Sequence, residues 1–527
     1  MAEQLALLPG RLVAHLELSL AALALAALVS VPLGIRVARR GGAASALLAA
    51  TSAAQTIPSL ALLAIMVPTL AGLGVLLHAP LAALGLELRG IGVAPALVAL
   101  TLYGMLPILR NTVTGLGGVD PAVREAARGV GMTPRQQLWR VDLPLALPVI
   151  VAGLRTAAVW IVGTATLSTP VGATSLGNFI FSGLQTRNGD AVLVGCVAAA
   201  ALALVLDQTI RLLEVGVRRR RRGLVALGCA ALLGLALPSA LGRARAAPGV
   251  RPIAIGAKTF TEQYVLAHVL EEQIRRATGT PVRSVESLGS TVAFDALRDG
   301  DLDVYVDYSG TLWANVLKRG EAPRERAELR ALVAEHLSRE YGIEVAAALG
   351  FENAYALGLR GDRARELGVA RISDLARVAP GLEIGADYEF LQRPEWAALV
   401  RVYGLAFRAE RSMDPALLYQ ALAQGEVDVI SAFTTDGRIA AQGIRLLEDD
   451  RGVIPPYDAL VLVGPRLRRE APDALAALAT LDGAIDADAM RRMNLAVDRD
   501  GASPAAVARR FVDGLDAAAA EAERLTH

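Results

Sequence analysis

The chain has few aromatic residues, few histidines and few cysteines. Phenylalanine, tryptophan and tyrosine make up 4% of the 527 residues, and there are five histidines and two cysteines. The sequence also has no Gly-x-x-x-x-Gly-Lys-Ser/Thr phosphate-binding loop, no His-Glu-x-x-His, no paired-cysteine metal motif and no Gly-x-Ser-x-Gly turn. These absences argue against an ATPase, a metalloenzyme and a serine hydrolase. We therefore predict a protein that is not an enzyme and that needs no cofactor or metal of its own.

Disulfide bonds and a large excess of one charge are also missing. The two cysteines, Cys196 and Cys229, lie in apolar stretches, and the second half of the chain has none, so that half folds without disulfides in any redox compartment. The formal net charge is only +1, but residues 218–222 form an unbroken arginine run beside an apolar segment. Because no aromatic residues are interleaved with it, this run predicts a positive-inside membrane anchor and no binding of nucleic acid.

Two kinds of sequence follow one another along the chain. Hydrophobic residues make up 54% and charged residues 20%, which is too apolar for a purely soluble protein and too charged for a purely membrane-embedded one. We predict an all-α transmembrane domain over 1–217, a linker over 218–250 that contains a sixth apolar run, and a soluble domain over 251–527.

The first part contains five apolar runs that could cross a lipid bilayer as helices. If the N-terminus is external, Arg36, Arg39 and Arg40 lie on the cytoplasmic side together with the arginine run at 218–222. The sixth run, 223–241, would then carry the chain outside; we expect a retained anchor, and cleavage after Ala246 is the alternative. The five expected spans are 12–37, 45–77 (a short lead-in, then a helix kinked by its prolines), 91–114, 145–169 and 191–213.

A polar segment from Glu125 to Pro144 interrupts the apolar runs. Glu125-Ala126-Ala127, Gly131 and Pro144 stand at the spacing of the cytoplasmic coupling loop, and the segment resembles that loop in permease subunits of ABC importers. The small alanines would let another protein approach closely, while Gly131 would end one short helix and Pro144 would begin the next. The alternative interpretation of this segment is an ordinary amphipathic loop between membrane helices.

From Arg251 onward, short β-rich runs alternate with amphipathic helices. Strands are expected at 252–256, 303–308 and 427–433, which is the pattern of an α/β domain. We predict two lobes of the kind found in periplasmic binding proteins, lobe I over about 251–355 and 455–527 and lobe II over about 356–454.

Both parts resemble subunits of ABC importers for glycine betaine, carnitine and choline, a group that includes fused transporters of ergothioneine. The resemblance implies a type I permease that forms a homodimer in the cytoplasmic membrane, with the C-terminal domain on the extracytoplasmic side. It also implies a separate ABC ATPase dimer that uses ATP and Mg. The permease segments that carry the resemblance are 56–61, 103–112 and 143–148, and the binding-domain segments are 256–263, 305–311, 389–393, 435–439 and 455–458.

A quaternary ammonium group has no N–H to donate and keeps its charge, so aromatic faces near negative charge must recognise it. Tyr308 is the first candidate for such a cage and Tyr388 the second, with Phe260 in a neighbouring matched segment. Tyr419 is as well explained by core packing as by a role in the cage. Tyr305 is better explained as a core residue, because it faces away from Tyr308 in a regular strand.

The other end of a betaine is a carboxylate, which needs hydrogen-bond donors. Thr259 followed by Glu262 has the capping-box pattern, so we expect a helix to begin at Thr259 and to present its amide groups to the cleft. Arg393 and Arg438 could clamp the carboxylate, or they could be solvated or lobe-bridging. The remaining candidates are the possible donors Thr261, Thr311, Thr434 and Thr435, and the acids Asp307 and Asp436, of which Asp436 could instead form a turn.

The sequence leaves two other functions open. A ligand-binding domain tethered to a membrane module could be a sensor, but a sensor has no need of a hairpin that docks an ATPase. The domain could also capture a different small amino-acid-like solute. The main prediction is an importer subunit for a small cationic or zwitterionic solute.

Overall fold

The computed structural model describes residues 2–38, 41–76, 90–186, 188–245, 251–319, 323 and 325–526. It divides into two compact units. The helical unit comprises Met1–Phe181 and Asp190–Gly249, and the α/β unit comprises Ser182–Gly189 and Val250–His527. Arg39, Arg40 and the possible cleavage site at Ala246 lie outside the described residues.

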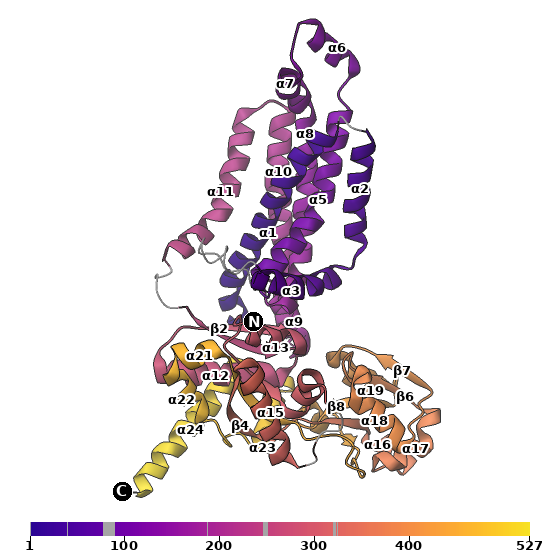
Figure 1. Ribbon diagram of the computed structural model, residues 1–527, viewed down its shortest axis with the longest axis vertical. Helices are drawn as coiled ribbons and strands as arrows, with labels where there is room; N and C mark the ends of the chain where they lie inside the picture. The colour runs from indigo at the N-terminus through magenta and orange to yellow at the C-terminus, as the bar shows by residue number, and fades with distance from the viewer. Residues whose placement is uncertain are drawn as a thin grey trace. The chain divides into compact units, whose positions relative to one another are not determined.

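Long apolar helices form the helical unit. Helix α5 packs against α1 and α8, and Figure 1 shows these helices side by side, with α6 and α7 projecting beyond one end of the bundle. The helices are α1 (Ala2–Val37), α2 (Gly41–Thr56), α3 (Ser59–Leu76), α5 (Val93–Gly117), α6 (Pro121–Gly129), α7 (Pro134–Gln137), the π-helix η1 (Leu138–Asp142), α8 (Leu143–Ala165), the 3-10 helix η2 (Thr166–Val171), α9 (Gly177–Gln185), α10 (Gly189–Arg218) and α11 (Arg222–Arg245).

Four of the described helices are long and apolar enough to cross a membrane: Gln4–Val37, Val93–Gly117, Pro134–Val171 and Gly189–Arg218. The run at 45–77 divides into α2 and α3 at Ile57 and Pro58. Proline has no N–H for the helix ladder and pushes the preceding residue out of the helical region, which explains the break. The lead-in is therefore a 16-residue helix, and α3 is an 18-residue apolar helix with Pro68 inside it.

The polar segment at 125–144 forms a hairpin, but it begins its second helix earlier than expected. Gly131 does end the first helix, with a backbone φ of +80° that glycine adopts without strain. The second helix begins at Pro134, where Thr133 and Gln136 form a capping box, and it continues through η1 into α8. Pro144 lies in the first turn of α8, as expected, but helical structure already precedes it from Pro134, and the π-helical turn just before it accommodates the missing N–H.

Close contact between α5 and α8 depends on Gly153. A Cβ atom there would come within 2.6 Å of the Asn111 Cβ and 2.9 Å of the Pro107 carbonyl oxygen. We expect Gly153→Val to destabilise the helical unit by about 1–3 kcal/mol, the usual cost of overpacking. Heat denaturation of the detergent-solubilised chain measures this, and Gly163→Val is the matched control because a Cβ at Gly163 meets nothing within 4 Å. Equal melting temperatures for both variants would contradict the packing.

Two five-stranded sheets form the α/β unit, in the orders β2-β1-β3-β10-β4 and β7-β6-β8-β5-β9. The strands are β1 (Ile253–Lys258), β2 (Val282–Leu288), β3 (Val304–Tyr308), β4 (Glu344–Glu352), β5 (Tyr355–Arg360), β6 (Glu383–Ala386), β7 (Ala409–Ser412), β8 (Val429–Phe433), β9 (Ile444–Leu446) and β10 (Asp458–Val463). The helices are α12 (Thr261–Thr278), α13 (Ser290–Arg298), α14 (Ser309–Leu312), the π-helix η3 (Trp313–Leu317), α15 (Arg326–Tyr341), α16 (Gly361–Leu367), α17 (Ile372–Val378), α18 (Pro394–Tyr403), α19 (Pro415–Gln424), α20 (Arg438–Ala441), α21 (Pro465–Glu470), α22 (Pro472–Ala479), α23 (Ala487–Asp498) and α24 (Pro504–Thr526), with 3-10 turns η4 (Ala379–Gly381) and η5 (Phe390–Gln392).

The first sheet takes one strand, β10, from the chain that follows the second sheet, whereas the second sheet consists of the consecutive strands β5 to β9. In the first sheet β1 pairs in parallel with β2 and β3, and β10 is antiparallel to β3 and β4. In the second, β6 pairs in parallel with β7 and β8, and β5 is antiparallel to β8 and β9. The chain passes between the sheets at 353–354 and at 447–457. Because the parallel strands end at one edge of each sheet, the loops that follow them are the expected place for a ligand.

Helix α12 starts two residues later than the capping-box prediction. Its N-cap is Phe260, with an extended φ of −149° and no side-chain cap, and its first helical residue is Thr261. Thr259 is therefore not the cap. Glu262 lies in the first turn, but its carboxylate contacts side chains from several elements and not the backbone of Thr259.

Candidate functional site

Aromatic rings from both lobes meet where the chain crosses between the two sheets. Phe260, Tyr308 and Tyr457 belong to the first lobe, and the second lobe supplies three more rings from the start of β5, from η5 and from the end of β8. The centroid distances are 5.5 Å for Phe260–Phe433, 6.2 Å for Phe260–Tyr308, 4.8 Å for Tyr355–Phe433, 4.8 Å for Tyr355–Phe390 and 5.9 Å for Tyr355–Tyr457. We call these six side chains the ring cluster.

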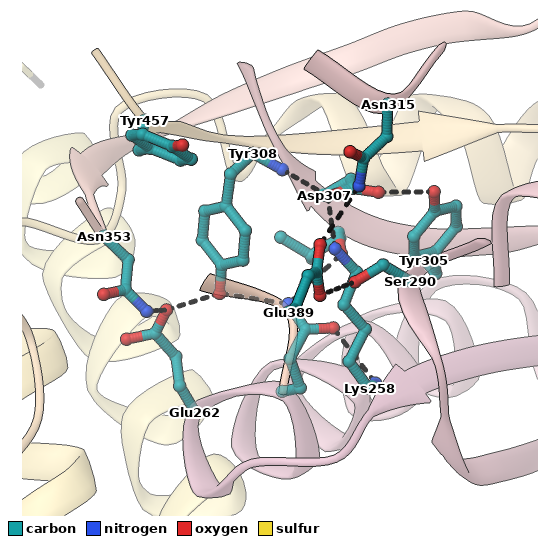
Figure 2. A network of polar contacts seen from close by, with 12 residues as sticks. Lys258, Glu262, Ser290, Tyr305, Asp307, Tyr308, Asn315, Asn353, Glu389 and Tyr457 are labelled. Carbon is teal, nitrogen blue, oxygen red and sulfur yellow. Dashed lines mark hydrogen bonds and ion pairs between the residues drawn. The ribbon is translucent and has the colours of Figure 1, made fainter. Parts of the chain in front are cut away.

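Tyr308 is fixed by hydrogen bonds at its hydroxyl group. It donates to the Glu262 carboxylate at 2.5 Å and accepts from Gln263 Nε2 at 3.0 Å. Figure 2 shows the hydroxyl pointing toward Glu262, with Asn353 beside the same carboxylate. Burial and the neighbouring Glu262 charge raise the pKa of Tyr308 well above its ordinary value, so the phenol keeps its proton. The ring is thereby held in one orientation.

A buried ion pair lies behind the backbone of Tyr308. The Lys258 ammonium pairs with Asp307, whose other oxygen accepts from the Tyr305 hydroxyl at 2.6 Å. The Asp307 carboxylate also accepts the Tyr308 backbone N–H at 2.7 Å (Figure 2). Tyr305 is fully buried, which places it in the core of the lobe. Asp307 therefore already has a cation partner.

Loss of Lys258 should destabilise the domain strongly. The side chains of Lys258 and Asp307 are 4% and 2% exposed, so Lys258→Met would leave a buried carboxylate without its cation. We expect a loss of about 3–5 kcal/mol in the free energy of unfolding. Urea unfolding of the chain measures it, with Arg339→Ala as the control, because Arg339 is 58% exposed and pairs only at the surface. Similar losses for both variants would contradict the role of this buried pair.

Arg393 places a cation against two rings of the cluster. Its guanidinium carbon lies 5.2 Å from the Tyr355 centroid and 5.7 Å from the Tyr457 centroid. It donates to Glu389 at 2.6 Å, to both Glu395 oxygens at 3.3 Å and to the Tyr457 hydroxyl at 3.1 Å. This arginine is 4% exposed, so it is not a solvated side chain.

Glu389 connects the two lobes. Glu389 belongs to the second lobe, and it accepts hydrogen bonds from Ser290 Oγ at 3.2 Å and from Asn315 Nδ2 at 3.0 Å. Both donors belong to the first lobe (Figure 2). Although burial opposes it, the charges of Arg393 and Lys258 lower the pKa of Glu389, so this carboxylate is ionised. The lobes are held together by polar contacts as well as by rings.

A cavity of about 810 Å³ opens beside the ring cluster. Tyr355, Glu395 and Thr434 line it from the second lobe, and Trp313 and Glu352 line it from the first. Its size is within the range of small-molecule sites. The rings, the paired charges and this cavity together form a candidate site for a small solute with a positive charge.

The structure brings only some of the predicted residues together. Phe260, Tyr308, Glu262, Thr435 and Arg393 meet at or next to the ring cluster. Thr434 lines the large cavity, and Thr311 lines a smaller one of about 260 Å³ with Ser290 and Asn315.

The other predicted residues stand apart from the rings. Tyr388 is 60% exposed and has no ring partner among the described residues. Arg438 pairs with Asp436 at 2.5 Å, and its guanidinium carbon lies 3.9 Å from the Tyr419 ring centroid, so these three residues form a separate cluster. Thr261 donates to Asp498 at 2.7 Å.

Several residues of the site were not predicted. Asn353 and Tyr355 lie at the first crossing between the lobes and Phe433 ends β8, and no local pattern distinguishes these residues from core residues. Phe390 and Tyr457 lie inside the segments 389–393 and 455–458, which already pointed to the site. The signal that could have found them is the position of an aromatic residue at the end of a strand near a lobe crossing.

The fold and the site define a class of protein: a two-lobed solute-binding domain joined to a helical membrane unit. Residues 251–514 match the substrate-binding domain of ABC-type glycine betaine transport systems, and residues 30–219 match the inner-membrane component of binding-protein-dependent transport systems. The chain belongs to the family of fused permease and substrate-binding subunits of osmoprotectant-type ABC importers. This confirms the predicted two-part fold and excludes an enzyme as the family function.

Three relatives illustrate the family. The ergothioneine transport permease/ergothioneine binding protein EgtU of Helicobacter pylori (strain G27) is 30% identical over 474 residues, which is 87% of this chain and 82% of that protein. The choline transport permease OpuBB of Bacillus subtilis (strain 168) is 40% identical over 38% of this chain and 83% of its own length. The carnitine transport binding protein OpuCC of Listeria monocytogenes is 30% identical over 49% of this chain and 85% of its own length.

Proposed function

We propose that this chain captures a betaine-type quaternary ammonium solute and provides its path through the cytoplasmic membrane. The ring cluster carries this proposal, because aromatic faces are the groups that hold a cation unable to donate a hydrogen bond. In a chain with 4% aromatic residues, six rings that meet between the two lobes are a marked concentration. Relatives named for ergothioneine, choline and carnitine support the same class of solute.

The charges around the rings suit a zwitterion. Arg393 faces two carboxylates, Glu389 and Glu395, so acidic groups outnumber basic ones on this side of the cluster. The trimethylammonium end would lie against the rings, and Arg393 would exchange one of its acidic partners for the carboxylate of the solute. Because the rings of the two lobes already touch, the lobes must part to admit the solute and close around it.

Transport then requires partners. The domain on the extracytoplasmic side would close on the solute and deliver it to a homodimer of the helical unit, and two ATPase chains would bind at the coupling hairpin. ATP and Mg would be used by those chains. The family supports an ATPase partner, since the inner-membrane component of such systems works with one.

Calorimetry on the detergent-solubilised full chain tests the proposal. The panel is choline, glycine betaine, carnitine and ergothioneine, with an ordinary amino acid such as glutamine as the comparison. We expect at least one quaternary amine to bind with a Kd in the micromolar range or below, about −8 kcal/mol. Tight binding of the amino acid with no binding of any quaternary amine would replace the proposed substrate class.

A further inference from the structure

Glu262 is a buried carboxylate with no basic partner among the described residues. It is 2% exposed and receives four hydrogen bonds: from Tyr308 at 2.5 Å, Thr435 Oγ1 at 2.5 Å, Asn353 Nδ2 at 2.9 Å and Asn494 Nδ2 at 3.2 Å. Two of these donors come from the first lobe, one from the crossing between lobes and one from the second lobe. No lysine, arginine or histidine in the described ranges forms an ion pair with it.

Neighbouring hydrogen bonds show that both Glu262 oxygens are acceptors. Gln263 Nε2 donates to the Val306 carbonyl at 3.1 Å and to the Tyr308 oxygen, so the Tyr308 proton must point to Glu262 Oε1. Asn494 Nδ2 donates to the Thr435 carbonyl at 2.8 Å, which fixes that amide and directs its N–H to Glu262 Oε2. Burial raises the pKa of Glu262, but hydrogen bonds from four side chains act in the opposite direction and favour the ionised form of the carboxyl group.

The two cations that lie over rings of the cluster, Lys258 over Tyr308 and Arg393 over Tyr355, already have anionic partners. Lys258 is paired with Asp307, and Arg393 is paired with Glu389 and Glu395. Burial raises the pKa of Glu262, which means that keeping this charge without a cation costs free energy. A positive charge in the ring cluster would offset that cost.

We infer that Glu262 is the counter-charge that makes the ring cluster selective for a cation, acting through Tyr308. A phenol that donates to an anion carries more electron density on its ring, and the fixed negative charge behind the ring adds to the attraction for a cation on its face. Glu262 touches Tyr308 and not the solute, so it is a positioning residue. The inference rests on the proposed capture of a quaternary ammonium solute and adds the source of its charge selectivity.

The same carboxylate links selectivity to closure. Thr435 comes from the second lobe, and Asn353 lies at the crossing, so the four donors assemble only when the lobes are together. In the open domain the carboxylate would lose Thr435 and regain water. Glu262 should therefore determine the preference for a cation over an uncharged ligand. Thr435 should stabilise the closed domain, and so raise the affinity, equally for any ligand of the same shape.

The experiment compares the affinity for a cation with the affinity for an uncharged analogue of the same shape. The quaternary amine that binds the wild-type full chain most tightly is titrated beside its tert-butyl analogue, in which carbon replaces the charged nitrogen. We expect Glu262→Gln, which keeps the side-chain size, to weaken the cation by about tenfold or more, while its affinity for the analogue stays within about twofold. Thr435→Val, which removes one donor at equal size, should weaken both ligands by the same factor. Heat denaturation of each variant establishes that it is folded.

The outcomes separate this inference from the proposed function. If the wild type binds a quaternary amine and Glu262→Gln binds it equally well, or loses the cation and the analogue to the same extent, Glu262 is not the counter-charge. If Glu262→Gln fails to fold, Tyr308→Phe takes its place, because it removes the hydroxyl that links the ring to Glu262. A reduced preference for the cation over the analogue in Tyr308→Phe, with an unchanged preference in Thr435→Val, supports the inference, and an unchanged preference in Tyr308→Phe contradicts it. A wild type that binds no quaternary amine overturns both.

Discussion

Replacing Tyr308 with alanine should reduce the affinity for the quaternary amine by about 1 to 2 kcal/mol or more, roughly tenfold in Kd. Its ring touches Phe260 in the first lobe, and its hydroxyl is the link to Glu262. The alanine variant removes a cation-binding face and one of the four donors to a buried carboxylate. Calorimetry on the solubilised chain gives the change in affinity.

Two variants sharpen this measurement. Tyr308→Phe keeps the ring and removes only the hydroxyl, so its affinity should lie between those of the wild type and the alanine variant. Tyr388→Ala removes a tyrosine of the neighbouring loop that is 60% exposed, and it should leave binding unchanged. If a folded Tyr308→Ala binds as the wild type does, Tyr308 is not a wall of the site; if Tyr388→Ala weakens binding as much, the location of the site is wrong.

Replacing Ala126 with arginine should abolish transport while leaving solute binding intact. Ala126 is exposed on α6, and the hairpin presents further exposed apolar side chains, Val130 at 74% and Trp139 at 62%. Exposed apolar side chains on a projecting hairpin are typical of a protein interface, and a long charged side chain at Ala126 would prevent close docking. Arginine is a good helix former, so α6 itself should not be disturbed.

Uptake of labelled solute into proteoliposomes, together with the ATPase chains, measures this effect. We expect a loss of at least about tenfold in the rate, since one misfitted group in a docked interface commonly costs 2 kcal/mol or more. Ala126→Ser keeps the residue small and should retain transport. Full transport by Ala126→Arg would mean that the hairpin does not dock the ATPase through this face.

In the hairpin, the local sequence pattern predicted one helix end and not the other. Gly131 was recognisable as a helix end, since a left-handed turn between two helices requires glycine. The start of the second helix was not, because Pro144 is as acceptable directly after a π-helical turn as at the N-terminus of a separate helix. The choice was made by Thr133 and Gln136, whose capping box begins the helix at Pro134.

A similar limit applies to the start of α12. Thr259 and Glu262 have the spacing of a capping box, yet β1 continues to Lys258 and Phe260 stays extended. The Phe260 ring lies 5.5 Å from Phe433 of the other lobe, and Glu262 is drawn to Tyr308 and Thr435. Contacts between lobes override a local preference worth about 1 kcal/mol.

The sequence by itself determined the division into a membrane part and a soluble part, the position of the hairpin, and Tyr308 as a residue of interest, because composition, apolar length and motif spacing are local properties of the chain. Only the tertiary structure decided which rings and charges meet. Tyr355, Phe433 and Glu262 lie far apart in the sequence. The antiparallel pairing of β5 with β8 places Tyr355 opposite Phe433, and the contacts of Phe260 with Phe433 and of Glu262 with Thr435 join the first lobe to them. No local pattern records such a meeting, since it depends on the pairing of strands separated by the whole of a lobe.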